Sequence, residues 1–289
     1  MLPQKRVLVV GSSGYLGRLV TEILTSTHFV VSTHNKKPYF PASTRYSFPH
    51  DDLSTLVKAH MADTCIFAAE IEKNQDYQEL DDLDFFRQAV RQLVQSLSTV
   101  RFVYISSDGI FDGQQGLYTE SDIPQPTTDY GRKLRACEDA VRTLCSDYCI
   151  IRPSYLYGHS LGTLDKRLQR TKSFCESQQE AIYFDDMFKS PLHVMDAANL
   201  IVTLALSQYI GIINIGGPRM SVFDFHREAM EAIGVSGKIS PSKMPSDAGL
   251  LRDTSLDATL CARLTGFRPK SVTDSLLRYL ESQLCFERG

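Results

Sequence analysis

The sequence lacks the patterns that mark zinc sites and disulfide frameworks. Its seven cysteines include no CxxC pair and are odd in number, and its seven histidines include no HxxH or HExxH motif. Zinc sites need closely spaced cysteine and histidine ligands, and disulfide frameworks need cysteines in pairs. We therefore predict no metal site, and cysteines that are mostly small buried apolar residues in a reducing compartment.

Long apolar runs and long basic runs are also missing. The apolar run at residues 7–10 is too short for the core of a signal peptide, and the longest later run, at residues 200–206, falls far short of the ~20 residues that a membrane span needs. The net charge of −3 gives no general attraction to nucleic acid or to anionic membranes. The sequence therefore predicts a soluble cytoplasmic protein with no nucleic-acid and no membrane partner.

The composition is that of an ordinary globular protein, and two kinds of hydrophobic pattern alternate along the chain. Its 289 residues, 43% of them hydrophobic, suffice for one large domain, or for one domain plus a lobe. Short β-rich runs alternate with longer helix-like segments, which predicts right-handed βαβ crossovers and a Rossmann-type, doubly wound parallel sheet in the α/β class. The expected strands are 6–10, 28–33, 45–48, 64–69, 102–106, 148–152 and 210–215, and the expected helices are 15–26, 52–60, 80–97, 128–144 and 188–206.

The alternating pattern loosens after Pro153. Later segments look like a smaller, loop-rich lobe, except that about 188–215 is expected to return to the sheet. We therefore predict a dinucleotide-binding Rossmann domain at 1–152 and a mainly substrate-binding C-terminal lobe at 153–289.

Three glycines mark the turn after the first expected strand. Gly11 permits a tight turn, Gly14 lets the backbone approach a pyrophosphate, and Gly17 lets the helix pack closely on the strand. The start of the following helix presents N–H groups and a partial positive charge to phosphates. The turn predicts dinucleotide binding, with a ligand-free glycine turn as the alternative. The candidate contacts are Gly11, Ser13, Gly14, Tyr15, Leu16 and Gly17.

The end of the second expected strand carries no acidic residue. It reads His34-Asn35-Lys36-Lys37. NAD sites usually place an acid here for the ribose 2′-hydroxyl, whereas a positive charge suits a 2′-phosphate. The two lysines therefore favour NADP(H), with NAD(H) as the alternative cofactor and a solvated Lys-Lys turn as the alternative interpretation. Asn35 and Lys36 are the candidate contacts.

Several later stretches carry a family resemblance. They are residues 104–113, 118–126, 130–138, 151–158, 190–196 and 254–257. Together they resemble dTDP-4-dehydrorhamnose reductases and related sugar-nucleotide reductases, a branch of the extended short-chain dehydrogenases/reductases. The GxxGxxG spacing of the glycine turn is also the form seen in that family. The resemblance covers nearly the whole chain and implies hydride transfer from a nicotinamide to a ketone.

The resemblance implies roles for individual residues. Tyr130 would be the general acid, and the Ser107 hydroxyl would hold and polarise the same carbonyl oxygen. A nucleotide sugar would be the substrate, with its nucleotide end in the C-terminal lobe; a homodimer is left open. Arg252 could meet a diphosphate, or be an ordinary exposed arginine. The residues placed at the cofactor are Asp52, Leu53, Ala68, Ala69, Tyr130 and Pro153.

The chain departs from the family at the catalytic lysine. In the family, a lysine four residues after the tyrosine lowers the tyrosine pKa and binds the nicotinamide ribose. Here that position is Leu134, and the lysine is Lys133. On an α-helix the two positions are about 100° apart. Lys133 is the candidate catalytic lysine if it reaches around the helix or if a bulge resets the register.

A second departure concerns a proton relay. Family members often have an asparagine in the helix after the fourth strand, and here that place falls on Phe86, with Asp84 nearby. Glu70 follows the Ala68-Ala69 pair, where a carboxylate would be unfavourable near a pyrophosphate unless it points to solvent.

Two functions therefore compete. One is an NADP(H)-dependent reductase of a keto sugar nucleotide. The other is a cofactor-binding regulatory protein without turnover, as in the regulatory β-subunit of methionine adenosyltransferase, which shares this family's fold. An NAD-dependent epimerase or dehydratase is disfavoured, because residues 104–126 resemble the reductase branch and the second strand ends in lysines.

Overall fold

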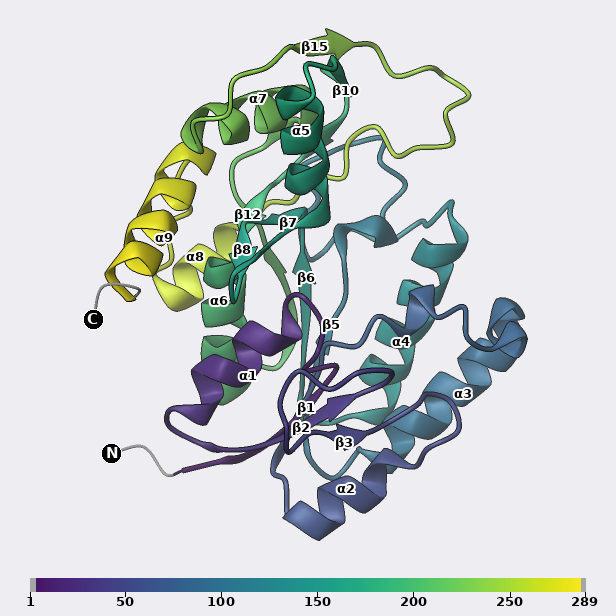
Figure 1. Ribbon diagram of the computed structural model, residues 1–289. Helices are drawn as coiled ribbons and strands as arrows, with labels where there is room; N and C mark the ends of the chain where they lie inside the picture. The colour runs from purple at the N-terminus through teal and green to yellow at the C-terminus, as the bar shows by residue number, and fades with distance from the viewer. Residues whose placement is uncertain (1–3, 287–289) are drawn as a thin grey trace. The chain divides into compact units, whose positions relative to one another are not determined.

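Strands and helices alternate through the first half of the chain (Figure 1). The computed structural model describes residues 4–286, with side chains described up to Tyr279. The strands are β1 (Arg6–Val10), β2 (Phe29–His34), β3 (Thr44–Arg45), β4 (Thr64–Phe67), β5 (Arg101–Ile105) and β6 (Tyr148–Pro153). The helices are α1 (Gly17–Thr25), α2 (Leu53–His60), α3 (Leu83–Ser96) and α4 (Asp129–Leu144), with short 3-10 helices η1 (Ile71–Lys73), η2 (Gln78–Asp81) and η3 (Asp108–Ile110).

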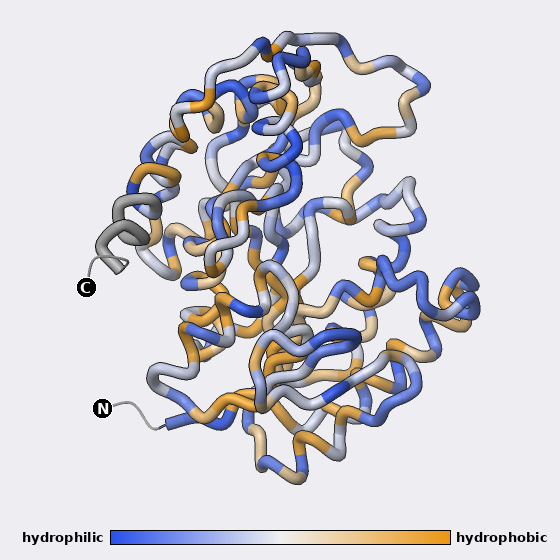
Figure 2. The backbone as a smooth tube through the Cα atoms, viewed as in Figure 1, coloured by the Kyte–Doolittle hydropathy of each residue, from blue (hydrophilic) through white to orange (hydrophobic). Residues whose placement is uncertain are grey.

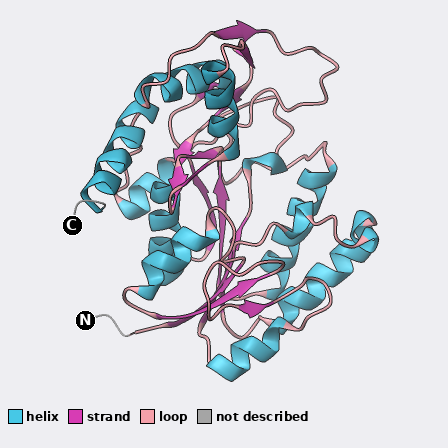
Figure 3. Cartoon of the chain, in the orientation of Figure 1, coloured by secondary structure: helices cyan, strands magenta, loops and turns pink. Residues whose placement is uncertain are grey.

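These strands belong to one seven-stranded sheet. Its order is β13-β6-β5-β4-β1-β2-β3, with β13 (Gly211–Ile215) arriving from much later in the chain. Neighbouring strands from β3 to β6 pair in parallel. Helices α2, α3 and α4 lie on one side of the sheet and α1 on the other (Figure 3). The fold is therefore the predicted Rossmann type, and its strand order reverses direction between β1 and β4, where such sheets bind ligands.

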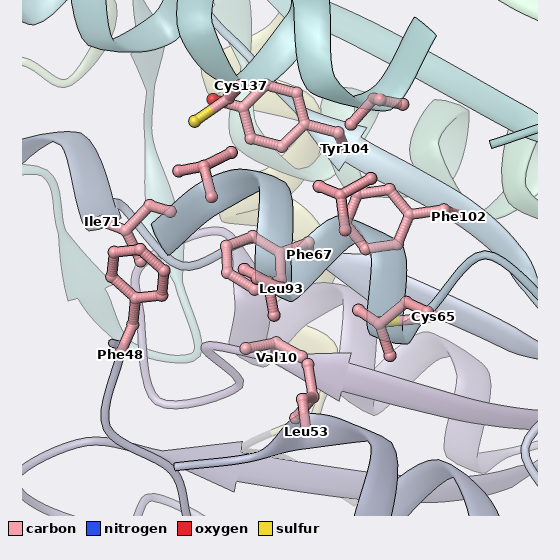
Figure 4. Close-up of a cluster of buried hydrophobic side chains, with 14 of the residues drawn as sticks. Val10, Phe48, Leu53, Cys65, Phe67, Ile71, Leu93, Phe102, Tyr104 and Cys137 are labelled. Atoms are coloured by element: carbon pink, nitrogen blue, oxygen red, sulfur yellow. The ribbon is translucent and has the colours of Figure 1, made fainter. Parts of the chain in front are cut away.

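The middle of the sheet is apolar because helices cover both faces. All of β4 is buried, as are Val7, Leu8, Val9 and Val10 of β1. Hydrophobic residues follow the strands in Figure 2. Figure 4 shows side chains from the strands and from α2, α3 and α4 meeting in one cluster. Each large apolar side chain fully buried there contributes about 1.5–3 kcal/mol.

Six cysteine side chains lie within the described part of the chain, and all six are buried and reduced. They are Cys65, Cys137, Cys145, Cys149, Cys175 and Cys261. The prediction that the cysteines are buried is confirmed for these six, while the side chain of Cys285 lies outside the described residues. Within that same part of the chain, no group of histidine, cysteine and acidic side chains could hold a metal ion. None of the described helices is long and apolar enough to span a membrane.

Three expected segments were wrong in detail. The strand expected at 45–48 is only Thr44–Arg45, because the apolar residues after it enter the core from a loop. The helix expected at 80–97 begins at Leu83, where the Asp82 carboxylate caps it. The helix expected at 188–206 begins only at Val194, since a proline at position 191 disfavours helical backbone before it.

Contacts divide the chain into two compact units. The first comprises Met1–Phe111, Ile123–Arg152 and Ala198–Ile213; the second comprises Asp112–Asp122, Pro153–Ala197 and Asn214–Gly289. The second unit has its own core. The remaining elements are β7 (Leu156–Tyr157), β8 (His159–Ser160), β9 (Thr163–Leu164), α5 (Lys166–Glu176), β10 (Ala181–Phe184), β11 (Phe188–Lys189), β12 (Leu192–His193), α6 (Val194–Leu206), β14 (Met220–Ser221), α7 (Val222–Ala232), β15 (Ile239–Ser242), α8 (Thr259–Thr265) and α9 (Val272–Phe286).

Candidate active site

The glycine turn joins β1 to α1 at the carboxyl edge of the sheet. Gly11 has a φ of +85°, and a Cβ there would lie 2.8 Å from the Cα of Ala69. A Cβ on Gly17 would lie 2.1 Å from the Gly11 carbonyl oxygen. Gly14 is exposed, and a Cβ there would approach only the Gly11 carbonyl oxygen, at 3.2 Å. The turn therefore forms a cradle that only glycines allow, with an open side at Gly14, and it fits a pyrophosphate.

The neighbouring strands hold this cradle in place. The backbone N–H of Gly11 donates to the Thr33 hydroxyl at 3.2 Å, and the Ser12 hydroxyl donates to the Thr33 carbonyl at 2.8 Å. Ala68 and Ala69 follow β4, and the Ala68 N–H donates to the Val10 carbonyl at 2.9 Å. The predicted contacts from the turn and from the Ala68-Ala69 pair thus meet at the ends of β1 and β4.

Three other residues that were predicted to contact the cofactor have roles in the local structure. The Asp52 carboxylate caps α2, accepting from the Ser54 N–H at 2.9 Å and from its hydroxyl at 2.8 Å. Leu53, the first residue of α2, is buried in the core. Pro153 is buried at the end of β6. Contact of these three with a cofactor remains a prediction.

The end of β2 meets an acidic residue from elsewhere in the chain. Asp76 lies between η1 and η2, and its carboxylate is 2.6 Å from the Lys36 ammonium. The Asn35 side-chain amide donates to the same carboxylate at 3.3 Å. The pairing with Lys36 lowers the pKa of Asp76. Asp76 therefore places an acidic side chain beside the end of β2, where the second strand itself carries none.

Ser107 and Tyr130 meet beyond the end of β5. A Cβ on Gly109 would lie 2.9 Å from Cε1 of Tyr130 and 3.7 Å from the Ser107 hydroxyl oxygen. Gly109 thus lets the Tyr130 ring lie directly against the backbone of η3. The Ser107 hydroxyl donates to Asp108 Oδ1 at 3.0 Å and accepts from the Gly109 N–H at 3.2 Å. The two candidate catalytic hydroxyl groups are brought together.

The surroundings of Tyr130 keep its hydroxyl protonated. Burial raises the pKa of Tyr130 most, and the negative charges of Glu72, Glu70 and Asp108 raise it further. A hydrogen bond with the Ser107 side chain acts in the opposite direction. Tyr130 therefore keeps its phenolic proton at neutral pH.

Helix α4 is continuous from Asp129 to Leu144, with the Thr128 hydroxyl as its N-cap. Leu134, four residues after Tyr130, is 1% exposed. Lys133 is also buried, and its ammonium lies 5.4 Å from the centre of the Phe86 ring. The residue at the family's lysine position is thus apolar, and the neighbouring lysine packs on the phenylalanine that stands at the family's asparagine position.

A buried ion pair ties the later part of α4 to β6. Arg152 donates to both carboxylate oxygens of Glu138, at 2.8 and 2.6 Å. The Ser106 hydroxyl, at the end of β5, donates to the same carboxylate at 2.6 Å. These contacts fix α4 against the sheet two turns beyond Tyr130.

A different lysine lies on the Tyr130 ring. The ammonium of Lys73, at the end of η1, is 4.9 Å from the ring centre. It pairs with the Glu70 carboxylate at 2.5 Å, and the Glu70 side chain is 67% exposed. The Glu70 carboxylate is thus exposed to solvent, which is the condition under which it would be tolerated near a pyrophosphate. Asp84 is exposed and pairs with Arg87 at 2.9 Å.

Glu72 lies between Glu70 and Lys73 in the sequence, and its side chain is buried. The Tyr104 hydroxyl donates to its carboxylate, and Cys137 of α4 also hydrogen-bonds it. Figure 4 shows Tyr104 and Cys137 side by side. Burial raises the pKa of Glu72 to about 7.

Sequence reasoning missed Glu72, Lys73 and Asp76. All three follow β4, at the edge of the sheet where parallel strands present ligand contacts. The charged run after Ala68-Ala69 was the available signal. Arg252, a candidate diphosphate contact, pairs with Asp186 within the second unit.

The fold is of the extended short-chain dehydrogenase/reductase type, and its glycine turn has the form that binds a dinucleotide in such folds. The chain belongs to the RmlD substrate binding domain family, which matches residues 5–285. It is 27% identical over 290 residues to the spore coat polysaccharide biosynthesis protein SpsK of Bacillus subtilis, covering 96% of this chain and 98% of that protein. It is also 24% identical over 162 residues to methionine adenosyltransferase 2 subunit beta of Danio rerio, covering 54% of this chain and 49% of that protein.

Solved structures share the fold over nearly the whole chain. A dTDP-4-dehydrorhamnose reductase from Bacillus anthracis, in complex with NADP, superposes with a TM-score of 0.80 at 21% identity, covering 97% of this chain and 100% of that chain. MoeE5, in complex with UDP-glucose and NAD, superposes with a TM-score of 0.74 at 20% identity, covering 96% and 99%. At these identities the likeness concerns the fold.

Proposed function

We propose that this chain is an NADP(H)-dependent reductase of a keto group in a nucleotide-linked sugar. The observation that carries the proposal is the pairing of Ser107 and Tyr130, with the Tyr130 ring lying against Gly109 at the carboxyl edge of the sheet. Parallel sheets of this type bind ligands at that edge. The family supports the reaction class, because it contains sugar-nucleotide reductases.

The two hydroxyl groups have separate tasks in a carbonyl reduction. When bound, the nicotinamide supplies a hydride to the carbonyl carbon. The oxygen then gains negative charge, and Tyr130 donates its phenolic proton to it. The Ser107 hydroxyl, which now donates to Asp108, would donate to the same oxygen and hold it in place.

The electrostatics around Tyr130 favour reduction over the reverse reaction. Oxidation of an alcohol needs the phenolate as a base, and burial and nearby carboxylates raise the pKa of Tyr130. Reduction needs the neutral phenol, which this environment preserves. Lys133 is the lysine that the sequence offers for the pair, but its ammonium contacts the Phe86 ring, so this proposal gives it no step in the reaction.

The cofactor would lie along the glycine turn. Gly11, Gly14 and Gly17 would admit its pyrophosphate, beside Ala68 and Ala69. The lysines at the end of β2 favour NADP(H), and NAD(H) is the alternative. Solved structures of the same fold contain either cofactor, and one also contains UDP-glucose, which supports a nucleotide sugar as the substrate.

A substrate panel tests the proposal. The purified protein is incubated with NADPH and a set of nucleotide-linked keto sugars, and loss of NADPH absorbance is followed. We expect at least one keto sugar to be reduced, and Tyr130→Phe to lose turnover while it still binds NADPH. Tyr148→Phe, which removes a hydroxyl at the far end of β6, is the matched control and should keep full activity.

A second function is favoured by one specific observation. Leu134 fills the position of the family lysine, and Phe86 that of the family asparagine. A cofactor-binding regulatory protein needs neither residue, and the similarity to methionine adenosyltransferase 2 subunit beta is consistent with it. Binding of NADPH without reduction of any keto sugar in the panel would support this alternative over the reductase.

A further inference from the structure

Asp76 joins Asn35 and Lys36 in one polar cluster, the Asp76 cluster, at the end of β2. The Asp76 carboxylate is 2.6 Å from the Lys36 ammonium and 3.3 Å from the Asn35 amide nitrogen. The end of β2 is where Rossmann folds recognise the adenosine ribose of a dinucleotide. A carboxylate and an ammonium therefore lie together at the place where such folds distinguish a ribose 2′-hydroxyl from a 2′-phosphate.

Local contacts hold the segment that carries Asp76. The Asn74 side-chain oxygen accepts from the Asp76 N–H at 2.9 Å, and the Asn74 amide donates to the Phe48 carbonyl at 3.3 Å. The next residue, Tyr77, shares a hydrogen bond of 2.9 Å with the Ser47 hydroxyl. The segment is thus anchored to the loop before α2, and this anchoring places the carboxylate at β2.

We propose that Asp76 is a specificity-determining residue for the cofactor, and that its carboxylate acts on the choice between NADH and NADPH. The inference rests on the proposed function, because it assumes the dinucleotide site. With NADH, the ribose 2′-hydroxyl donates to the Asp76 carboxylate while Lys36 stays paired. With NADPH, the 2′-phosphate takes Lys36 for itself and meets a carboxylate of like charge.

Exposure of the cluster makes this exchange of partners feasible. The Lys36 side chain is 73% exposed and that of Asp76 is 32% exposed, so water and salt weaken their attraction. Asp76 is ionised at every pH used in an assay, since the neighbouring ammonium lowers its pKa. The carboxylate therefore opposes the phosphate under all ordinary conditions.

Binding affinity, rather than turnover, tests the proposal. Dissociation constants for NADPH and NADH are measured by fluorescence of the bound reduced nicotinamide, for the full-length wild type and for Asp76→Asn. We expect the wild-type constants to lie within about tenfold of each other, and Asp76→Asn to tighten NADPH and weaken NADH by about tenfold each, as for one charge-assisted contact. Glu79→Gln is the matched control, because it removes an acid of η2 that pairs with His50 at 3.5 Å.

A second background separates the two roles of Asp76. With Lys36→Met already present, Asp76→Asn should still weaken NADH, whereas its gain for NADPH should shrink because no ammonium is released. Equal shifts for both cofactors in Asp76→Asn, or the same selective shift in Glu79→Gln, would overturn the inference. Selective binding without reduction of any keto sugar would overturn the reductase proposal alone, and failure of the wild type to bind either cofactor would overturn both.

Discussion

The ammonium of Lys73 lies 4.9 Å from the centre of the Tyr130 ring. Lys73 comes from η1, after β4, and not from the helix that carries the tyrosine. The lysine on that helix, Lys133, lies on Phe86 instead. A cation thus lies on the ring of the candidate general acid, but it comes from a different segment from the one that carries the lysine in the family.

This placement predicts different effects for the two lysines. Proton transfer from Tyr130 leaves negative charge on its ring and oxygen, and the Lys73 ammonium over the ring would stabilise that charge. We expect Lys73→Met to lower the reductive kcat about three- to tenfold, a modest loss because the side chain is exposed. The pH profile should change as well, with turnover in the oxidative direction rising at a higher pH than in the wild type.

Lys133→Met is the matched control for Lys73→Met. It removes an ammonium that contacts an aromatic ring, and such contacts contribute about 0.5–2 kcal/mol to stability. We expect a small loss of unfolding free energy and little change in kcat. If Lys133→Met abolishes turnover while Lys73→Met leaves it intact, Lys133 is the working lysine and Lys73 is a surface residue.

Glu72 predicts a specific pH dependence of stability. Burial raises its pKa from 4.5 to about 7, so the folded state holds this proton more tightly than the unfolded state does. The stability contributed by that proton is complete below pH 4.5 and is lost as the pH rises to 7, a loss on the order of 3 kcal/mol. Glu72→Gln should remove this loss, because the amide oxygen still accepts from the Tyr104 hydroxyl.

Urea unfolding at pH 5 and pH 8 measures the effect. The difference in unfolding free energy between Glu72→Gln and the wild type should move in favour of the variant as the pH rises. Glu79→Gln, in exposed η2, should show no such trend. A constant difference across this range would mean that Glu72 titrates near its ordinary pKa in the folded protein.

The hydrophobic periodicity of the sequence and the spacing of its glycines made most of the fold predictable. Buried strands such as β1 and β4 contain continuous apolar runs, and the Gly11 turn lies directly after one of them. Both signals are local, so they can be recognised without knowledge of the tertiary structure. The strand expected at 45–48 failed for the complementary reason, since Tyr46 and Phe48 reach the core from a loop.

The site was predictable only where it follows strand ends. Ser107 and the Ala68-Ala69 pair could be placed because each ends a strand of a parallel sheet. Asp76 could not, because it lies in irregular backbone and reaches β2 through contacts between segments far apart in sequence. Helix geometry predicts the position of the Lys133 Cα. The position of its ammonium depends on Phe86, which contacts it in the folded protein.

The glycine turn predicts two distinct outcomes for two glycines. Gly14→Val should abolish NADPH binding in a folded protein, because its side chain would fill the open side of the cradle. Gly17→Ala should instead destabilise the fold, since its Cβ would lie 2.1 Å from the Gly11 carbonyl oxygen. Circular dichroism, thermal unfolding and NADPH titration of both variants measure this. Unchanged NADPH affinity in a folded Gly14→Val protein would show that the turn is not the phosphate site.

Restoring a lysine at position 134 tests the catalytic role of the missing cation. Leu134 is 1% exposed and stands four residues after Tyr130 on a continuous helix. An ammonium there would lower the pKa of Tyr130 and help to anchor the nicotinamide ribose. We expect Leu134→Lys to raise oxidation more than reduction near neutral pH, because only oxidation needs the phenolate. Burying the charge should also cost several kcal/mol of stability unless it finds a partner.

Leu134→Met separates charge from packing in this test, because it changes the shape of the buried side chain without adding an ammonium. It should leave the ratio of oxidation to reduction unchanged. Lys133→Thr alone should also change little, and combined with Leu134→Lys it should retain the gain in oxidation. Loss of all activity in Lys133→Thr would assign the role to Lys133 and contradict the helical argument. If every variant binds NADPH and none reduces a keto sugar, the regulatory function is supported, because the cation at position 134 is then not what the chain lacks for turnover.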